Sequence, residues 1–223
     1  IKTTSNLFSI IRLMNINKIT FIDLNDQPIS NINSDISGGR RIDVVSNKPV
    51  SFNELYFRSS SAVDLKNNKC TYATVVESNP RIMNLQITNF VAYSSDCILN
   101  NCAVNGGVCK LYITDKIPPS IYIVNNTVFN PTSISVIFYQ IYAAKHLLDS
   151  DSAYLMFYSE DTQLINSLVS RINFQDNFET IYGYKAVKSK DNKGIYLVSD
   201  SFNEANAPDT TTPIDDQFAD DDI

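Results

Sequence analysis

The chain has 223 residues, of which 43% are hydrophobic and 19% charged, and its formal net charge is −6. This apolar fraction is typical of a globular core and excludes a wholly disordered chain. No apolar run approaches the length of a membrane-spanning helix, so the sequence predicts no transmembrane segment.

In the first half of the chain, Ser5 can cap a short helix over residues 5–14. Asn25, Asp26 and Pro28 predict a loop after the first strand. The spacing of the strands favours antiparallel pairing, and no internal repeat at solenoid periods is visible. β-Branched content and alternation predict strands over residues 18–24, 41–45, 53–57, 70–76, 82–91 and 108–113.

The second half mixes helices and strands. Asn130 and Pro131 predict the start of a helix over 131–149, although the β-branched residues of 131–142 equally allow a strand. Asp161 can cap a helix that runs to Ile172. Strands are expected over 121–124 and 153–158, and a hairpin over 180–187 and 195–198.

These elements predict an α+β fold. An antiparallel, β-rich part over about 1–117 packs against a β-α-β-α-β-β part over about 118–200. A mainly-β sandwich or jelly roll is the alternative. We expect residues 1–203 to form a single globular domain and residues 204–223 to form an acidic tail.

The acidic tail accounts for most of the net charge, because it contains no Lys or Arg and the rest of the chain is close to neutral. One interpretation is a solvated tail. The other is an arm that binds a basic partner or a neighbouring subunit, since apolar residues are spaced among the acids. The expected partner-binding residues are Asp215, Asp216, Phe218, Asp220, Asp221 and Asp222.

The predicted hairpin combines basic and aromatic residues, a combination that suits a phosphate backbone with stacked bases. The nucleic-acid-binding candidates are Lys185, Lys188, Lys190, Lys193, Tyr182 and Tyr184. In addition, residues 133–141 (SISVIFYQI) resemble a segment of the C-terminal Y region of the large nidovirus replicase subunit. The resemblance covers a small part of the chain and lacks that region's zinc-binding Cys/His clusters. It is too short to identify a family.

Residues that could support catalysis are few. His146 is the single histidine, and a hydrolase-type enzyme would combine it with Lys145 and Tyr142. No glycine-rich nucleotide loop or HExxH motif is present, and the sequence indicates no cofactor and no small-molecule substrate. The cysteines Cys70, Cys97, Cys102 and Cys109 lack zinc-knuckle spacing, so free, partly buried thiols are favoured over disulfides and over a metal site.

These observations favour a non-enzymatic assembly or interaction domain over an enzyme. A structural component of a virus particle or viral complex, with protein subunits as partners, fits best. The two alternatives are a viral replicase accessory domain that binds RNA through the Lys/Tyr hairpin and a small hydrolase built on His146.

Overall fold

The computed structural model describes residues 2–3, 11–14, 18–23, 29–37, 41–46, 50–58, 62–113, 118–138, 149–173 and 183–210. Side chains are described from Val50 onward, except those of Asn67, Phe138 and Asn173. None of the described helices is both long and apolar enough to cross a membrane.

Strands dominate the described part of the chain, together with one α-helix and one short 3-10 helix. In chain order these elements are β1 (Lys2–Thr3), β2 (Ile11–Met14), β3 (Lys18–Asp23), β4 (Ile29–Ser37), β5 (Arg41–Ser46), β6 (Val50–Phe57), β7 (Ala62–Val76), β8 (Arg81–Tyr93), β9 (Asp96–Asn100), β10 (Ala103–Asn105), β11 (Val108–Ile113), β12 (Ser120–Val124), β13 (Val128–Asn130), β14 (Ser133–Phe138), β15 (Ala153–Ser159), α2 (Thr162–Asn173), β16 (Tyr184–Lys188), β17 (Gly194–Ser199) and η1 (Glu204–Asn206).

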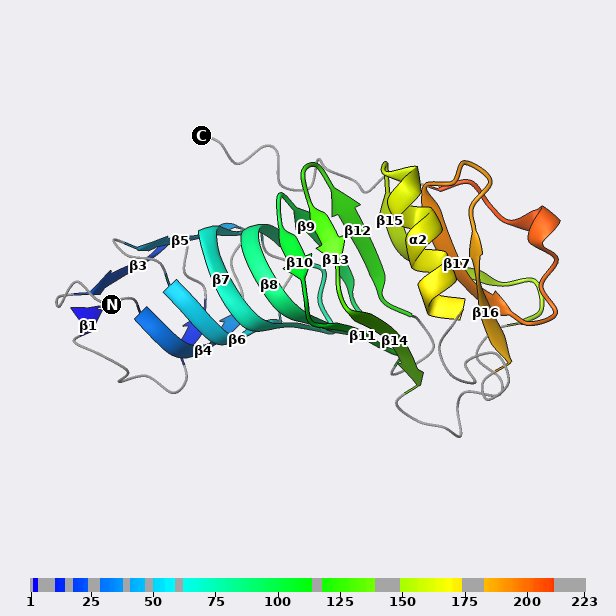
Figure 1. Ribbon diagram of the computed structural model, residues 1–223. Coiled ribbons are helices and arrows are strands. Elements are labelled where there is room, and N and C mark those ends of the chain that lie inside the picture. The colour runs from blue at the N-terminus through cyan, green and yellow to red at the C-terminus, as the bar shows by residue number, and fades with distance from the viewer. Residues whose placement is uncertain are drawn as a thin grey trace.

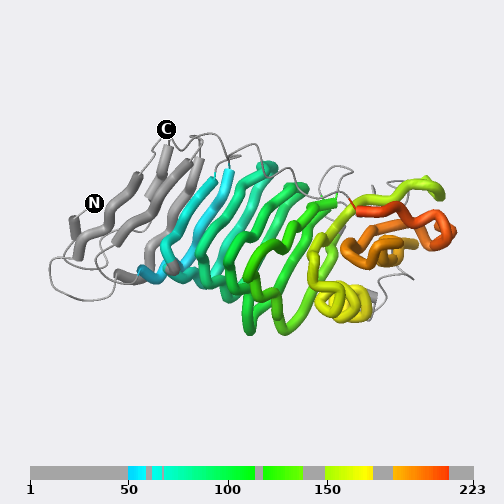
Figure 2. Tube along the Cα trace, turned by 90° about the horizontal axis from the view of Figure 1, so that it is seen from above, coloured from blue at the N-terminus to red at the C-terminus, as the bar shows by residue number. Residues whose placement is uncertain are grey.

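From β1 to β15 the chain winds into a parallel β-solenoid (Figure 1). Each coil pairs with the coil before it, as Figure 2 shows from β6 onward. Val63 pairs with Ile82, and Ile82 pairs with Leu99. One coil therefore takes roughly 20 residues. Because successive coils stack directly, side chains at equivalent positions form ladders along the solenoid.

Three runs of parallel strands make up the wall of the solenoid. The first face contains the starts of β7 and β8, followed by β9, β12 and β15. The second face contains the start of β6, the middle of β7 and β8, then β10 and β13. The third face contains the ends of β6, β7 and β8, then β11 and β14.

Apolar ladders fill the interior of the solenoid. Inside the second face, Cys70 pairs with Ile87, and Val104 pairs with Ile87 and Phe129. All four side chains are at least 97% buried. Full burial of one such side chain stabilises the fold by about 1.5–3 kcal/mol, so these ladders carry much of the stability.

An asparagine ladder marks the corner between the first and second faces. Asn84, Asn101 and Asn125 all have positive φ, at 55°, 51° and 53°. Asn tolerates this left-handed conformation better than other non-glycine residues. The Nδ2 of Asn101 donates to Oδ1 of Asn84 at 2.7 Å, and the Nδ2 of Asn84 donates to Oδ1 of Asp64 at 2.8 Å. The ladder thus fixes the turn and ties adjacent coils together.

The C-terminal end of the solenoid is closed by α2 and an antiparallel hairpin (Figure 1). β15 pairs in parallel with β12 and antiparallel with β17, which in turn pairs with β16. Ile165, Leu168 and Ile172 of α2 are fully buried in the main core. The Oδ1 of Asp161 caps the helix by accepting from the amides of Gln163 and Leu164 at 3.0 and 3.1 Å.

Several predictions of the fold are wrong. The solenoid strands are parallel, so the antiparallel N-terminal sheet of an α+β fold is not formed. The described residues are mainly β, as the alternative prediction stated, but they form a solenoid in place of a sandwich or jelly roll. Part of the expected helix 5–14 is β2. Of the two alternatives for residues 131–142, the strand is the one formed over β14, whose β-branched residues suit it. Between the predicted strands 18–24 and 41–45 the chain also forms β4, which was not predicted, whereas Asn25, Asp26 and Pro28 lie outside the described residues.

The predicted helix 161–172 and the predicted hairpin are confirmed as α2 and as β16 with β17. The sequence shows no solenoid repeat because the coils differ in length. One coil runs from Ile82 to its partner Leu99. Another coil runs from Cys109 to its partner Ile134 and is several residues longer.

Candidate functional site

A groove of about 670 Å³ runs along the second face of the solenoid and crosses four consecutive strands, β6, β7, β8 and β10. Its lining is mostly polar, with one lysine. The residues that line it are Ser51, Phe52, Lys69, Cys70, Thr71, Gln86, Ile87, Thr88, Ala103 and Asn105.

Strand alternation explains this lining. Ser51 pairs with Lys69, Lys69 with Gln86, and Gln86 with Ala103, so these four side chains form one outward ladder. The residues that follow them along each strand point into the core instead. The outward polar groups of successive coils therefore lie side by side and open to solvent.

The border between the second and third faces is built by close backbone packing. A Cβ at Gly107 would lie 2.2 Å from the backbone oxygen of Thr88, so only glycine fits there. Asn89 holds the neighbouring coils, because its Nδ2 donates to the oxygen of Thr71 at 3.1 Å and its Oδ1 accepts from the amide of Val108 at 3.0 Å. The coils that form the groove wall are thus tied together by backbone packing and by side-chain hydrogen bonds.

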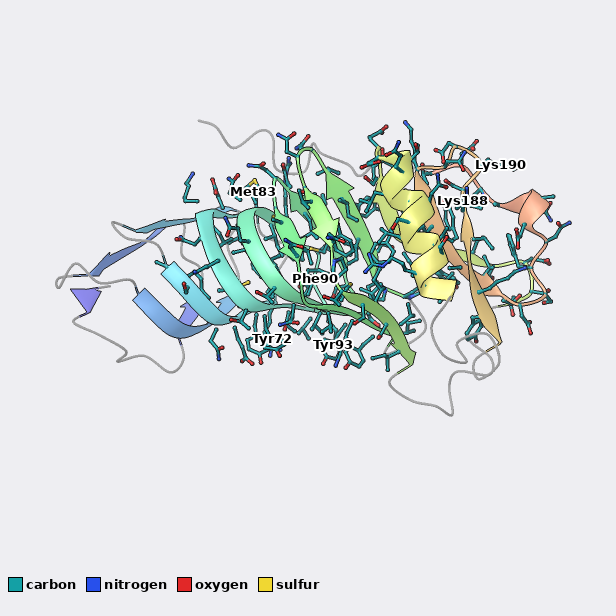
Figure 3. The ribbon with its side chains drawn as sticks, viewed as in Figure 1. Tyr72, Met83, Phe90, Tyr93, Lys188 and Lys190 are labelled. Atoms are coloured by element: carbon teal, nitrogen blue, oxygen red, sulfur yellow. The ribbon has the colours of Figure 1, made fainter. Side chains whose placement is uncertain are left out.

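The third face carries an outward set of tyrosines, Tyr56, Tyr72, Tyr93 and Tyr112, which we call the tyrosine face. Tyr93 stacks on Tyr112, with ring centroids 4.5 Å apart and an interplanar angle of 6°. Tyr72 is 41% exposed. Figure 3 shows Tyr72 and Tyr93 on the same side of the solenoid, opposite Met83 of the first face.

Charged residues of both signs accompany the tyrosines. Arg58 lies over the ring of Tyr56, 5.5 Å from its centroid, and Glu54 accepts a hydrogen bond from the Tyr56 hydroxyl at 3.0 Å. Burial, reinforced by this hydrogen bond, raises the pKa of Tyr56. Lys110 projects from the same face on β11. The face is therefore aromatic and carries both charges.

Three of the four hairpin lysines contact their own chain. Lys185 forms an ion pair with Glu204 at 3.1 Å, and Lys193 forms one with Glu160 at 2.7 Å. The Nζ of Lys188 donates to Oδ1 of Asn166 on α2 at 2.8 Å. Lys190 is exposed, and Figure 3 shows it with Lys188 at the capped end of the molecule.

The aromatic partners proposed for these lysines are placed differently. Tyr184 is 97% buried in the core and so offers no ring for base stacking. Tyr182 lies outside the described residues. RNA binding by the hairpin stays a prediction, and the groove and the tyrosine face are the stronger candidate sites.

The first residues of the predicted acidic tail fold back on the hairpin. Ala207 is 97% buried, and the Tyr196 hydroxyl donates to the oxygen of Asp209 at 3.1 Å. Residues Asp215, Asp216, Phe218, Asp220, Asp221 and Asp222, predicted to bind a partner, lie outside the described part of the chain. Tyr142, Lys145 and His146, the residues of the hydrolase alternative, lie outside it too.

The four cysteines are free, as the favoured interpretation expected, and all four are fully buried where partial burial was expected. Burial raises the pKa of every thiol, to about 11 for Cys102 and about 12 for Cys109. They act as small apolar side chains of the core. Among the described residues, no group of three or more His, Cys, Asp or Glu side chains is arranged to hold a metal ion.

Neither the groove nor the tyrosine face was predicted from the sequence. A signal for the groove exists, because Lys69-Cys70-Thr71 and Gln86-Ile87-Thr88 share a polar–apolar–Thr pattern on adjacent coils. The tyrosines lie on separate strands that are distant in the sequence, and the register pairs Tyr93 directly with Tyr112. In comparisons with family models, curated proteins and solved structures, none matches this chain.

Proposed function

We propose that this chain is a non-enzymatic interaction domain that associates with a second copy of itself through the tyrosine face. The proposal rests on one observation, the set of four outward tyrosines on the third face of the solenoid. Tyrosine and arginine are enriched at protein interfaces because they bury a large area at a small entropic cost. A structural role in an assembly such as a virus particle stays a prediction from the sequence.

The charges on the tyrosine face favour a second copy as the partner. Glu54 lies on β6 and Lys110 lies on β11, so opposite charges sit on different coils of one face. In a two-fold symmetric dimer, the same patch meets itself in reverse order. Glu54 of one protomer can then face Lys110 of its partner, which makes the face self-complementary.

Light-scattering mass measured after size exclusion, over a range of concentrations, tests this proposal. The wild-type chain is expected to form a dimer, and Tyr72→Asp is expected to be monomeric because it places an unpaired charge in the interface. Val128→Asp is the matched control, since Val128 is 55% exposed on the second face. A monomeric wild type, or equal dimerisation of both variants, would refute the proposal.

A charge exchange tests the proposed arrangement directly. Glu54→Lys and Lys110→Glu each place like charges across the two-fold axis and are expected to weaken the dimer about tenfold or more. The double variant restores opposite charges and is expected to recover most of the affinity. If the losses of dimer affinity simply add in the double variant, these residues do not meet across an interface.

The chain used in these measurements should extend at least to Thr210. A chain that ends at Asn203 would lack Ala207, which is 97% buried against the hairpin. Its mass could then change through partial unfolding rather than through loss of the acidic residues. A chain ending at Thr210 keeps the packed segment and removes only residues 211–223.

A further inference from the structure

We infer that the groove on the second face binds an extended acidic glycan, one that carries carboxylates on a chain of sugars. This site is separate from the tyrosine face, and the inference does not depend on self-association. It follows from the chemistry of the lining, the position of Lys69, and the spacing of the coils.

The lining matches a ligand rich in hydroxyl groups. Ser51, Thr71 and Thr88 supply hydroxyls, and Gln86 and Asn105 supply side-chain amides. Each of these groups can both donate and accept a hydrogen bond. Sugar hydroxyls have the same dual capacity, so each can pair with the lining without leaving a polar group unsatisfied.

Lys69 supplies the only formal charge among the residues that line the groove. Its side chain is exposed, and within the described part of the chain it forms no ion pair. An ammonium group free to meet a ligand favours one that carries an anionic group. A single lysine among neutral side chains suits a carboxylate on one sugar of the chain.

The geometry of the wall suits a repeating ligand. Ser51, Lys69, Gln86 and Ala103 lie on consecutive coils, and neighbouring strands are about 4.8 Å apart. The length of one sugar unit in an extended glycan is close to this spacing. A glycan aligned with the solenoid axis would therefore meet one ladder position per sugar, on a wall whose strands are already hydrogen-bonded together.

Other polymers fit this groove less well. A nucleic acid needs several cations along its backbone and aromatic rings for its bases, and the lining offers one lysine and no tyrosine or histidine. A protein segment would need apolar pockets for its side chains, but the outward ladder is polar or small. An acidic glycan makes use of both the neutral groups and the charge.

Calorimetric titration of the full chain tests the inference. The probes are hexamers of β-1,4-glucuronate, α-1,4-galacturonate and β-1,4-mannuronate, each beside its neutral sugar counterpart. At least one acidic hexamer is expected to bind about tenfold more tightly than its neutral counterpart. Failure of all three acidic hexamers to bind at millimolar concentration would overturn the inference.

Two variants and one control locate the binding. Lys69→Gln is expected to remove the preference for the acidic hexamer, and Thr88→Phe is expected to weaken both members of the pair by filling the groove. Lys190→Gln removes an exposed lysine of the hairpin and is expected to change nothing. Equal losses of affinity for the acidic hexamer in Lys69→Gln and Lys190→Gln would show general charge attraction and overturn the site. Thermal unfolding confirms that each variant is folded.

Discussion

Thr210 donates two hydrogen bonds to Oδ2 of Asp191, one from its amide at 3.2 Å and one from its hydroxyl at 2.5 Å. These bonds fasten residues 204–210 to the turn between β16 and β17. The other carboxylate oxygen of Asp191 accepts from the Ser189 hydroxyl at 2.5 Å and from the Lys193 amide at 3.3 Å. One carboxylate therefore orders both the turn and the segment that covers it.

Asp191 is expected to make the stability of the chain depend on pH in the acid range. Partial burial opposes ionisation, but the hydrogen bonds from Ser189 and Thr210 overcome this and lower the pKa to about 2. A carboxyl with a lowered pKa in the folded state stabilises the fold above about pH 4, and this contribution is lost as the pH falls toward 2. Asp191→Asn should cost about 1 kcal/mol at pH 7, after allowance for solvent screening.

Urea unfolding at pH 7 and near pH 2 measures this effect. The wild type and Asp191→Asn should differ at pH 7 and converge at the lower pH. Thr210→Val removes the hydroxyl donor and gives a matched comparison. In the double variant, its loss of unfolding free energy should not add to the loss caused by Asp191→Asn. A constant difference at both pH values would assign the effect to packing rather than to charge.

Asn84 is expected to matter both for its backbone conformation and for its side chain. Asn84→Ala loses the hydrogen bonds to Asp64 and Asn101 and forces alanine into the left-handed region, at φ 55°. We expect the free energy of unfolding to fall by about 2–3 kcal/mol. Asn84→Gly allows the left-handed backbone conformation, so its free energy of unfolding should fall by about half as much. If both variants unfold at the same temperature, the backbone conformation carries no cost.

Two adjacent glycines should respond differently to alanine. Gly107→Ala would place its Cβ 2.2 Å from the Thr88 oxygen of the neighbouring coil, so the coils must separate and the loss should be several kcal/mol. Gly106 has φ +82° and no atom within 4 Å of an added Cβ, so Gly106→Ala should cost only about 1 kcal/mol. Thermal unfolding gives the order of stability, and the reverse order would contradict the close packing of Gly107 against β8.

The cysteine thiols are expected to resist modification in the native state. All four are buried, and burial raises their pKa, so little thiolate forms near neutral pH. An aromatic disulfide reagent at pH 8 should label no thiol in buffer and four in denaturant, without prior reduction. Rapid labelling in buffer would show an accessible thiol, and incomplete labelling in denaturant would show a disulfide.

Local features were predictable where a short segment determines its own structure. The Asp161 cap and the apolar spacing of Leu164, Ile165 and Leu168 are enough to predict α2. The hairpin of β16 and β17 also follows from local turn chemistry. In contrast, residues 133–138 carry helical spacing and β-branched side chains together, and pairing with β11 decides for a strand.

Parallel pairing was not predictable from single segments. An isolated strand such as Cys70–Val76 has the same alternation in a parallel or an antiparallel sheet, and only its partners distinguish the two. The coils differ in length, so no fixed period reveals the winding. The candidate sites share this limit, since Tyr93 and Tyr112 meet only through the register of β8 and β11.

The helix α2 gives the stack of coils a defined terminus. Ile165, Leu168 and Ile172 cover the last exposed rungs of the core, where an unprotected stack would offer its apolar end to another molecule. Growth by addition of coils at this end is therefore blocked, and the number of coils before α2 sets the length of the molecule. Since each coil contacts only its neighbours, duplication of one coil would lengthen the groove by one rung and leave the cap intact.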